Sequence, residues 1–73
     1  MDHNTAKAII ASVRPDLIVD EKDHGSHVNV RRVAGGQLHS ITLPHGTANA
    51  PLTPEQEHEL FVGALEHVDR FLR

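Results

Sequence analysis

The sequence contains no cysteine, no tryptophan and no tyrosine, and its 73 residues include only two phenylalanines. The absence of cysteine excludes disulfide bonds, thiolate zinc sites and a cysteine nucleophile. The core must therefore be built almost wholly from aliphatic side chains. With this length and 38% hydrophobic residues, the sequence predicts one small domain that spans residues 1–73.

Long hydrophobic segments are also missing. No apolar run approaches the ~20 residues that a membrane-spanning helix needs. The first residues lack the basic and apolar regions of a signal peptide. We therefore expect a cytoplasmic protein without a membrane partner.

Charge is unevenly distributed, although the net charge is only −3. Residues 26–47 contain Arg31 and Arg32 but no acidic residue, whereas the segments on either side carry an excess of acids. The middle of the chain therefore predicts a weakly cationic surface suited to an anionic ligand. Ordinary variation of surface charge is the alternative interpretation.

A first helix is expected at residues 5–13. Asn4 is a suitable N-cap, and Pro15 ends the helix because the residue before a proline is pushed out of the helical region. The buried stripe consists of apolar residues at helical spacing, namely Ala6, Ile9, Ile10 and Val13.

A second helix is expected at residues 54–72. Thr53 is the predicted N-cap, Pro54 occupies the first helical position, and Gln56 completes a capping box. The broad apolar face of this helix consists of Leu60, Phe61, Ala64, Leu65, Val68 and Leu72. The acidic residues of the helix are expected to face water or a partner.

Three strands are expected between the helices, at residues 17–23, 26–33 and 38–43. The middle strand alternates Val28 and Val30 with polar residues, which is typical of a half-buried strand. Gly25 allows a tight reversal before this strand, and Gly35-Gly36 predicts a hairpin turn after it.

The order of these elements predicts an α+β fold with two layers. We expect an α-β-β-β-α arrangement, in which a three-stranded antiparallel sheet carries both helices on one face. The other face of the sheet is then open, and His27, Asn29 and Arg31 are expected to project from it. Ser40 and Thr42 of the third strand are expected to point outward as well.

Gly25-Ser26-His27 stands out because it places an imidazole directly after a glycine hinge, where a strand begins. Histidine changes its charge near neutral pH, so this side chain can accept or donate a proton. A histidine with a purely structural surface role is the alternative interpretation.

The arrangement resembles the HicA family of small mRNA-interferase toxins. The similar parts are Gly25-Ser26-His27 at the start of the second strand, the turn at Gly35-Gly36 and the segment Ile41-Thr42-Leu43-Pro44-His45. They cover most of residues 5–72. The resemblance implies a fold like that of double-stranded-RNA-binding domains, an endoribonuclease activity on mRNA, and a cognate antitoxin protein that neutralises the toxin.

The same resemblance implies which residues act. His27 would be the catalytic residue, a general base or acid in RNA cleavage without a metal or other cofactor. Gly25 would let the RNA backbone approach closely, and Ser26 would hydrogen-bond a phosphate or orient the imidazole.

Arg31, which shares a strand face with His27, is expected to contact a phosphate. Lys22 and His45 are further candidates for substrate binding, and either of them, or His24, is a candidate second catalytic group. Two features depart from the family. His45 follows Pro44 directly instead of one residue later, and no basic residue leads into the last helix.

The histidines also allow a metal site. His24 and His27 have a spacing found among ligands, and His39, His45 and nearby acids could join them. The sequence contains no His-Glu-x-x-His or comparable strong motif, so we expect no metal.

A further alternative is not catalytic. The chain could be a binding or inhibitor module from a mobile element that acts through protein–protein contacts. The open sheet face and the acidic side of the last helix are the surfaces available for them. The sequence does not predict an oligomeric state.

Overall fold

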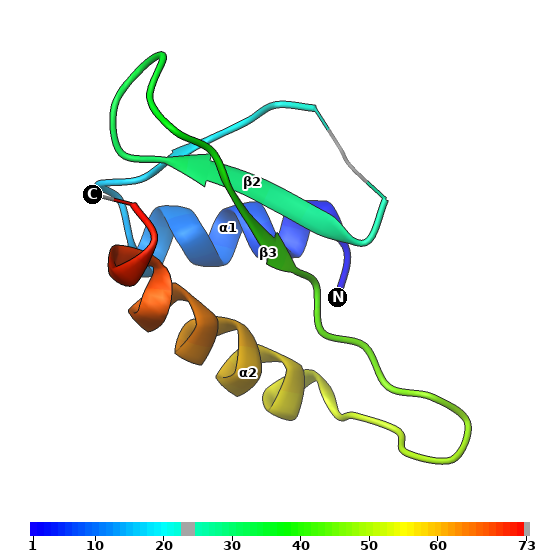
Figure 1. The fold of residues 1–73 in the computed structure, drawn as a ribbon. Coiled ribbons are helices and arrows are strands. Elements are labelled where there is room, and N and C mark those ends of the chain that lie inside the picture. The colour runs from blue at the N-terminus through cyan, green and yellow to red at the C-terminus, as the bar shows by residue number, and fades with distance from the viewer. Residues whose placement is uncertain (23–24, 73) are drawn as a thin grey trace.

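Three strands and two main helices make up the computed structural model, which describes residues 1–22 and 25–72 (Figure 1). In chain order the elements are α1 (His3–Val13), β1 (Ile18–Val19), β2 (His27–Arg31), β3 (His39–Thr42), α2 (Pro54–His67) and the short 3-10 helix η1 (Val68–Arg70). The strands form one antiparallel sheet in the order β1-β2-β3, and both helices lie on one side of it. The predicted α+β class and element order are confirmed.

The start of α1 differs from the prediction. The Asp2 side chain, not that of Asn4, caps the helix by accepting a hydrogen bond from the Thr5 backbone N–H at 2.7 Å. This bond lowers the pKa of the Asp2 carboxyl. Because a carboxylate also interacts favourably with the helix dipole, Asp2 starts the helix two residues before the predicted first residue.

The capping box at the start of α2 is confirmed. The Thr53 hydroxyl oxygen accepts a hydrogen bond from the Gln56 backbone N–H at 3.1 Å, and the Gln56 side-chain oxygen accepts one from the Thr53 N–H at 2.9 Å. The α-helix ends earlier than predicted, at His67, and η1 continues it as one tighter turn.

The strands are shorter than predicted, β1 most of all. After Val19 the N–H of Asp20 still bonds to β2, through the Asn29 carbonyl at 2.9 Å. Residues 21 and 22 have already left the strand, and residue 23 lies outside the described part. β2 and β3 pair over four residues, with Val28 opposite Ile41 and Asn29 opposite Ser40.

The core lies between the sheet and the helices and is aliphatic except for one ring. It consists of Ala6, Ile9, Ile10, Leu17, Val28, Val30, Ile41, Leu43, Phe61, Leu65, Val68 and Leu72. Two residues predicted to be buried are not, since Val13 is 39% exposed and Leu60 is 55% exposed. Val13 is the last residue of α1. Leu60 lies on a side of α2 that the sheet does not cover.

A cluster of charged residues joins α1, α2 and the loop after β2. The Arg14 guanidinium donates hydrogen bonds to the Leu65 carbonyl and to the carboxylates of Asp16 and Asp69, at 2.9–3.0 Å. Arg32 donates to Asp69 as well. The hydrogen bonds from Arg14 lower the pKa of Asp16 and of Asp69.

None of the helices described within residues 1–22 and 25–72 has both the length and the hydrophobicity that crossing a membrane requires.

Candidate functional site

The side of the sheet opposite the helices, here called the outer face, carries mostly polar side chains. Their positions follow from the register, because side chains alternate along a strand and Val28, Val30 and Ile41 are buried on the inner face. The outer face consists of Ile18 of β1, His27, Asn29 and Arg31 of β2, and Ser40 and Thr42 of β3. Neither α1 nor α2 covers it (Figure 1).

The predicted motif Gly25-Ser26-His27 lies at one end of this face. Gly25 has a φ of 58°, a left-handed conformation that costs other residues energy. The Ser26 carbonyl then accepts a hydrogen bond from the Leu43 N–H at 2.7 Å, which extends the β2–β3 ladder by one pair. His27 is half-buried and lies opposite Thr42. The motif therefore turns the chain and delivers the imidazole to the outer face.

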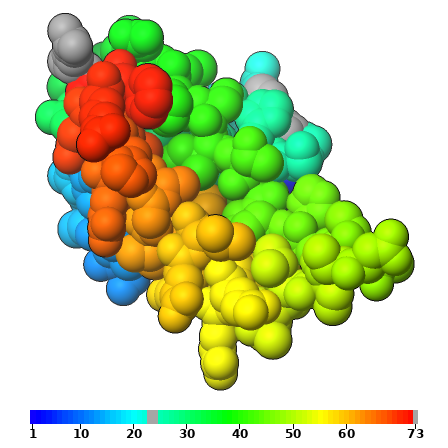
Figure 2. Space-filling view, turned by 60° about the horizontal axis from the view of Figure 1, so that its bottom comes forward, coloured from blue at the N-terminus to red at the C-terminus, as the bar shows by residue number. Residues whose placement is uncertain are grey.

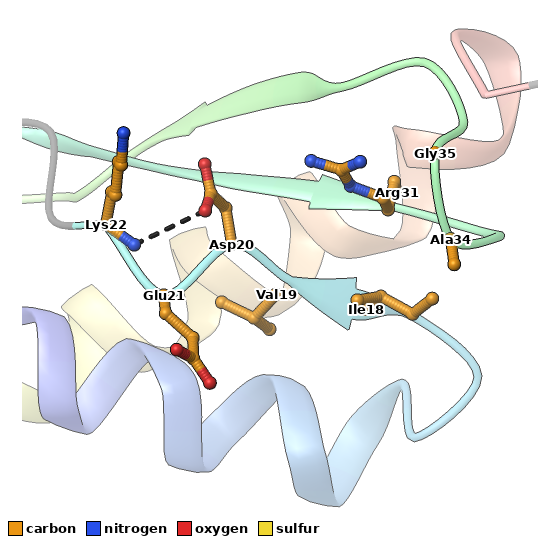
Figure 3. Close-up of a pocket in the computed structure, with 8 residues that line it drawn as sticks. All are labelled: Ile18, Val19, Asp20, Glu21, Lys22, Arg31, Ala34 and Gly35. Carbon is orange, nitrogen blue, oxygen red and sulfur yellow. Dashed lines mark hydrogen bonds between the residues drawn. The ribbon is translucent and has the colours of Figure 1, made fainter.

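Arg31 lies at the other end of β2, four residues from His27, which corresponds to about 13 Å along a strand. Its side chain and those of Asp20 and Lys22 point to the same side, and all three line one shallow hollow (Figure 3). The other lining residues are Ile18, Val19, Glu21, Ala34 and Gly35. Lys22 and Arg31 thus line the same hollow, with Lys22 toward the start of β2 and Arg31 at its end.

Two acids modify the charge of this hollow. The Asp20 carboxylate lies between Lys22 and Arg31 and accepts a hydrogen bond from the Lys22 backbone N–H at 3.3 Å (Figure 3). The Glu21 side chain points the other way, toward α1. The carboxylate of Asp20 therefore offsets part of the positive charge that Lys22 and Arg31 bring to this hollow.

The two consecutive arginines have different surroundings. Arg31 belongs to the outer face, whereas Arg32 is bound to Asp69 at the C-terminal end of the helical layer. Asp69 also binds Arg14, so this carboxylate is shared by two guanidinium groups. Of the two arginines, only Arg31 stands where an outer-face ligand would meet it.

Asn29 was expected to project from the outer face but is only 8% exposed. It lies between His27 and Arg31 along the strand, and its side-chain oxygen accepts a hydrogen bond from the Ser40 hydroxyl at 2.5 Å. Sequence reasoning missed this pair. The sequence predicts that both side chains point outward. That they can bond to each other follows only from the register, which places them opposite each other.

His45 lies at the same end of the sheet as the glycine motif, because it follows Leu43, which pairs with Ser26. Its ring is exposed, and Nδ1 lies 3.2 Å from the Leu43 carbonyl oxygen. His45 and His27 therefore lie at the same end of the sheet. Of the other two candidates, Lys22 lines the hollow beside Arg31, and His24 lies outside the described residues.

The structure separates two of the histidines considered as metal ligands, His27 and His39. His39 faces the inner side of β3 and stacks on Phe71, with ring centroids 4.6 Å apart and planes inclined by 5°. His27 is on the opposite face. Within residues 1–22 and 25–72 no three histidine or acidic side chains come together as a metal site would require.

Comparisons of the chain with protein-family models, with curated proteins and with solved structures find no match. The resemblance to the HicA family therefore remains a hypothesis drawn from the sequence. The function has to be argued from the geometry of the outer face.

Proposed function

We propose that this chain is a HicA-like toxin, with a fold like that of double-stranded-RNA-binding domains, which cleaves mRNA in the cytoplasm with His27 as general base or acid. The observation that carries the proposal is the place of His27. It is the first residue of the central strand, half-buried, on the face that the helices leave open, two residues after the left-handed Gly25.

The chemistry needs no metal. A base takes the proton of a ribose 2′-hydroxyl, and the 2′-oxygen attacks the adjacent phosphorus. The bond from phosphorus to the 5′-oxygen breaks, and this oxygen takes up a proton, which leaves a 2′,3′-cyclic phosphate and a 5′-hydroxyl. Imidazole suits either proton transfer, and a positioned acid–base group contributes roughly 10²–10⁴-fold.

The surroundings of His27 suit a bound RNA strand. Apart from its neighbours in the chain, no atom of the described residues lies within 4 Å of the position that a Gly25 side chain would occupy, so a phosphate can approach the backbone there. The Ser26 side chain is exposed, as is His45, a candidate for the second proton transfer at the same end of the sheet. Arg31 and Lys22 would hold phosphates further along the strand.

Cleavage of a labelled RNA by the purified protein tests the proposal. We expect His27→Ala to lower the rate at least about 100-fold, with products that end in a cyclic phosphate. His58→Ala removes an exposed histidine of α2 and serves as the matched control, with an unchanged rate. A wild-type protein that leaves RNA intact, or a His27→Ala variant as active as the wild type, contradicts the proposal.

The proposal also implies a partner. A toxin of this kind needs an antitoxin protein that covers the outer face. Induced expression of the wild type should slow growth, and induced His27→Ala should not. Co-expression of the antitoxin should restore growth.

A second function, a non-catalytic binding module, is favoured by one observation. Asp20 stands between Lys22 and Arg31, and Arg32 is bound to Asp69, so few cations are available to phosphates. This function predicts that wild type and His27→Ala are equally harmless and that neither cleaves RNA.

A further inference from the structure

The free edge of β3 has hydrogen-bonding groups but no neighbouring strand. β3 pairs only with β2 in the described part of the chain. The bond between the Leu43 N–H and the Ser26 carbonyl sets the alternation of the ladder. The backbone groups of Ile41 therefore point toward β2, and those of Ser40 and Thr42 point to the free edge.

This edge lacks the features that usually protect one. Exposed edge strands commonly carry a proline, a lysine or a bulge that prevents pairing with another chain. β3 has the sequence His-Ser-Ile-Thr, and both Ser40 and Thr42 are exposed. The edge is thus open to an added strand.

In the helical layer beside this edge, α2 and the residues after it present a row of apolar side chains, here called the flank. Leu60 and Ala64 are one helical turn apart, and Phe71 follows on the same side. Leu60 and Phe71 are each 55% exposed. The stack of Phe71 on His39 places this flank beside β3, and Figure 2 shows α2 and the β3 segment side by side.

The charges of this flank indicate what covers it. Gln56, Leu60, Ala64, His67 and Phe71 include no acidic residue, lysine or arginine. Glu55 and Glu66 lie around the helix from them, whereas Glu59 lines one hollow with Leu60 and Gln56 and borders the flank. Apart from this border, the flank offers no charge to attract a partner of opposite sign, and its apolar residues can pack against a second copy of themselves.

We propose that a second copy of this chain docks here, β3 against β3, antiparallel about a two-fold axis at Ile41. Ser40 then faces Thr42 of the second copy, and Thr42 faces its Ser40. Two such pairs form four backbone hydrogen bonds. The axis keeps both helical layers on the same side, so the two Leu60–Phe71 flanks meet beneath the seam and bury their apolar surface.

The resulting six-stranded sheet explains why Leu60 is exposed although it belongs to the apolar pattern of α2. The dimer also extends the outer face into one surface with two copies of His27 and Arg31. The dimer does not depend on RNA cleavage. It uses the edge of β3 that faces away from β2 and from the glycine motif.

Molar mass by light scattering over a range of concentrations tests the dimer. We expect the wild-type chain to have twice the monomer mass at high concentration, and Leu60→Lys to weaken association by roughly tenfold or more. Val33→Lys, at a residue of similar exposure in the β2–β3 loop, should leave the association constant within about twofold. Circular dichroism verifies that both variants fold. A wild-type chain that stays monomeric overturns the proposal, as does equal weakening by both variants.

A cross-link tests the register, and the absence of cysteine from the chain makes it unambiguous. Directly paired residues of this kind have Cα atoms about 5.5 Å apart, which suits a disulfide. Ser40→Cys mixed with Thr42→Cys should therefore give a mixed disulfide on oxidation. Ser40→Cys mixed with Val33→Cys should not. Equal yields from the two mixtures overturn the proposed register.

Discussion

The two ends of β2 use their polar residues differently. At the arginine end, Arg32, Asp69 and Arg14 bind one another and tie the loop after β2 to both helices. At the histidine end, a left-handed glycine and a backbone hydrogen bond shape the chain, and the side chains of Ser26 and His45 are left exposed. Charged side chains at the first end bind one another across the fold, whereas the second end leaves polar side chains exposed.

The largest effect on stability should come from breaking the arginine end. Arg14→Ala removes hydrogen bonds to the Leu65 carbonyl and two carboxylates from a side chain that is only 17% exposed. We expect the free energy of unfolding to fall by roughly 1–3 kcal/mol. Denaturation in urea measures this change.

Denaturation of His27→Ala in urea tests whether the two ends differ in this way. Its loss of unfolding free energy should be smaller than that of Arg14→Ala, while its RNA cleavage per folded molecule should be far lower. If His27→Ala is the less stable variant, the proposed division between the two ends is wrong.

A smaller loss of stability is expected from the glycine hinge. Gly25→Ala forces a side chain into the left-handed region, which costs about 1–2 kcal/mol, and no neighbouring atom adds a clash. Gly63→Ala is the control, because Gly63 lies inside α2 with equally free space and alanine favours a helix. We expect opposite signs for the two changes in urea denaturation. A stabilising Gly25→Ala would contradict the expected strain.

The hollow beside β1 offers a change in RNA affinity. Asp20→Asn removes the negative charge between Lys22 and Arg31, and we expect RNA to bind a few-fold more tightly at low salt. Glu21→Gln makes the same charge change in a side chain that points toward α1, so its effect should be smaller. Titration of a fluorescent RNA measures both. Equal effects would show that only the net charge matters.

The smallest expected effect is a pH dependence from the arginine end. Arg14 lowers the pKa of Asp16 and of Asp69 in the folded state. The stabilisation is therefore complete above the unfolded pKa of about 3.9 and is lost as the pH falls through the lower folded values. Thermal unfolding between pH 2 and 6 should show this loss, reduced in Asp69→Asn. A loss of the same size in that variant would assign it to other carboxyls.

Much of the fold is predictable because its signals are local. The capping box of Thr53 and Gln56 lies within four residues, and the alternation of Val28 and Val30 is read along one strand. The errors come from non-local facts. Leu60 has the right spacing for the core, but its exposure depends on how far the sheet extends beyond β3.

The candidate site shows the same division. The sequence places His27 and Arg31 on one strand face, and the register agrees with that placement. Nothing local predicts that Asp20 comes to lie between Lys22 and Arg31, because this depends on how β1 pairs with β2. The catalytic role of His27 stays a prediction until cleavage is measured.

The bond between Asn29 and Ser40 has a consequence for the alignment of the hairpin. A slip of β3 by one residue would turn its core residues outward, so the hydrophobic pattern alone excludes it. A slip by two residues keeps the apolar residues inside, and the pattern does not exclude it. With Leu38 opposite, the buried Asn29 oxygen would lose its hydroxyl donor, whereas the slip in the other direction sets the Thr42 hydroxyl there. This polar pair therefore disfavours the slip toward Leu38, one of the two that the hydrophobic pattern allows, and so narrows the position of His27 relative to the end of β3.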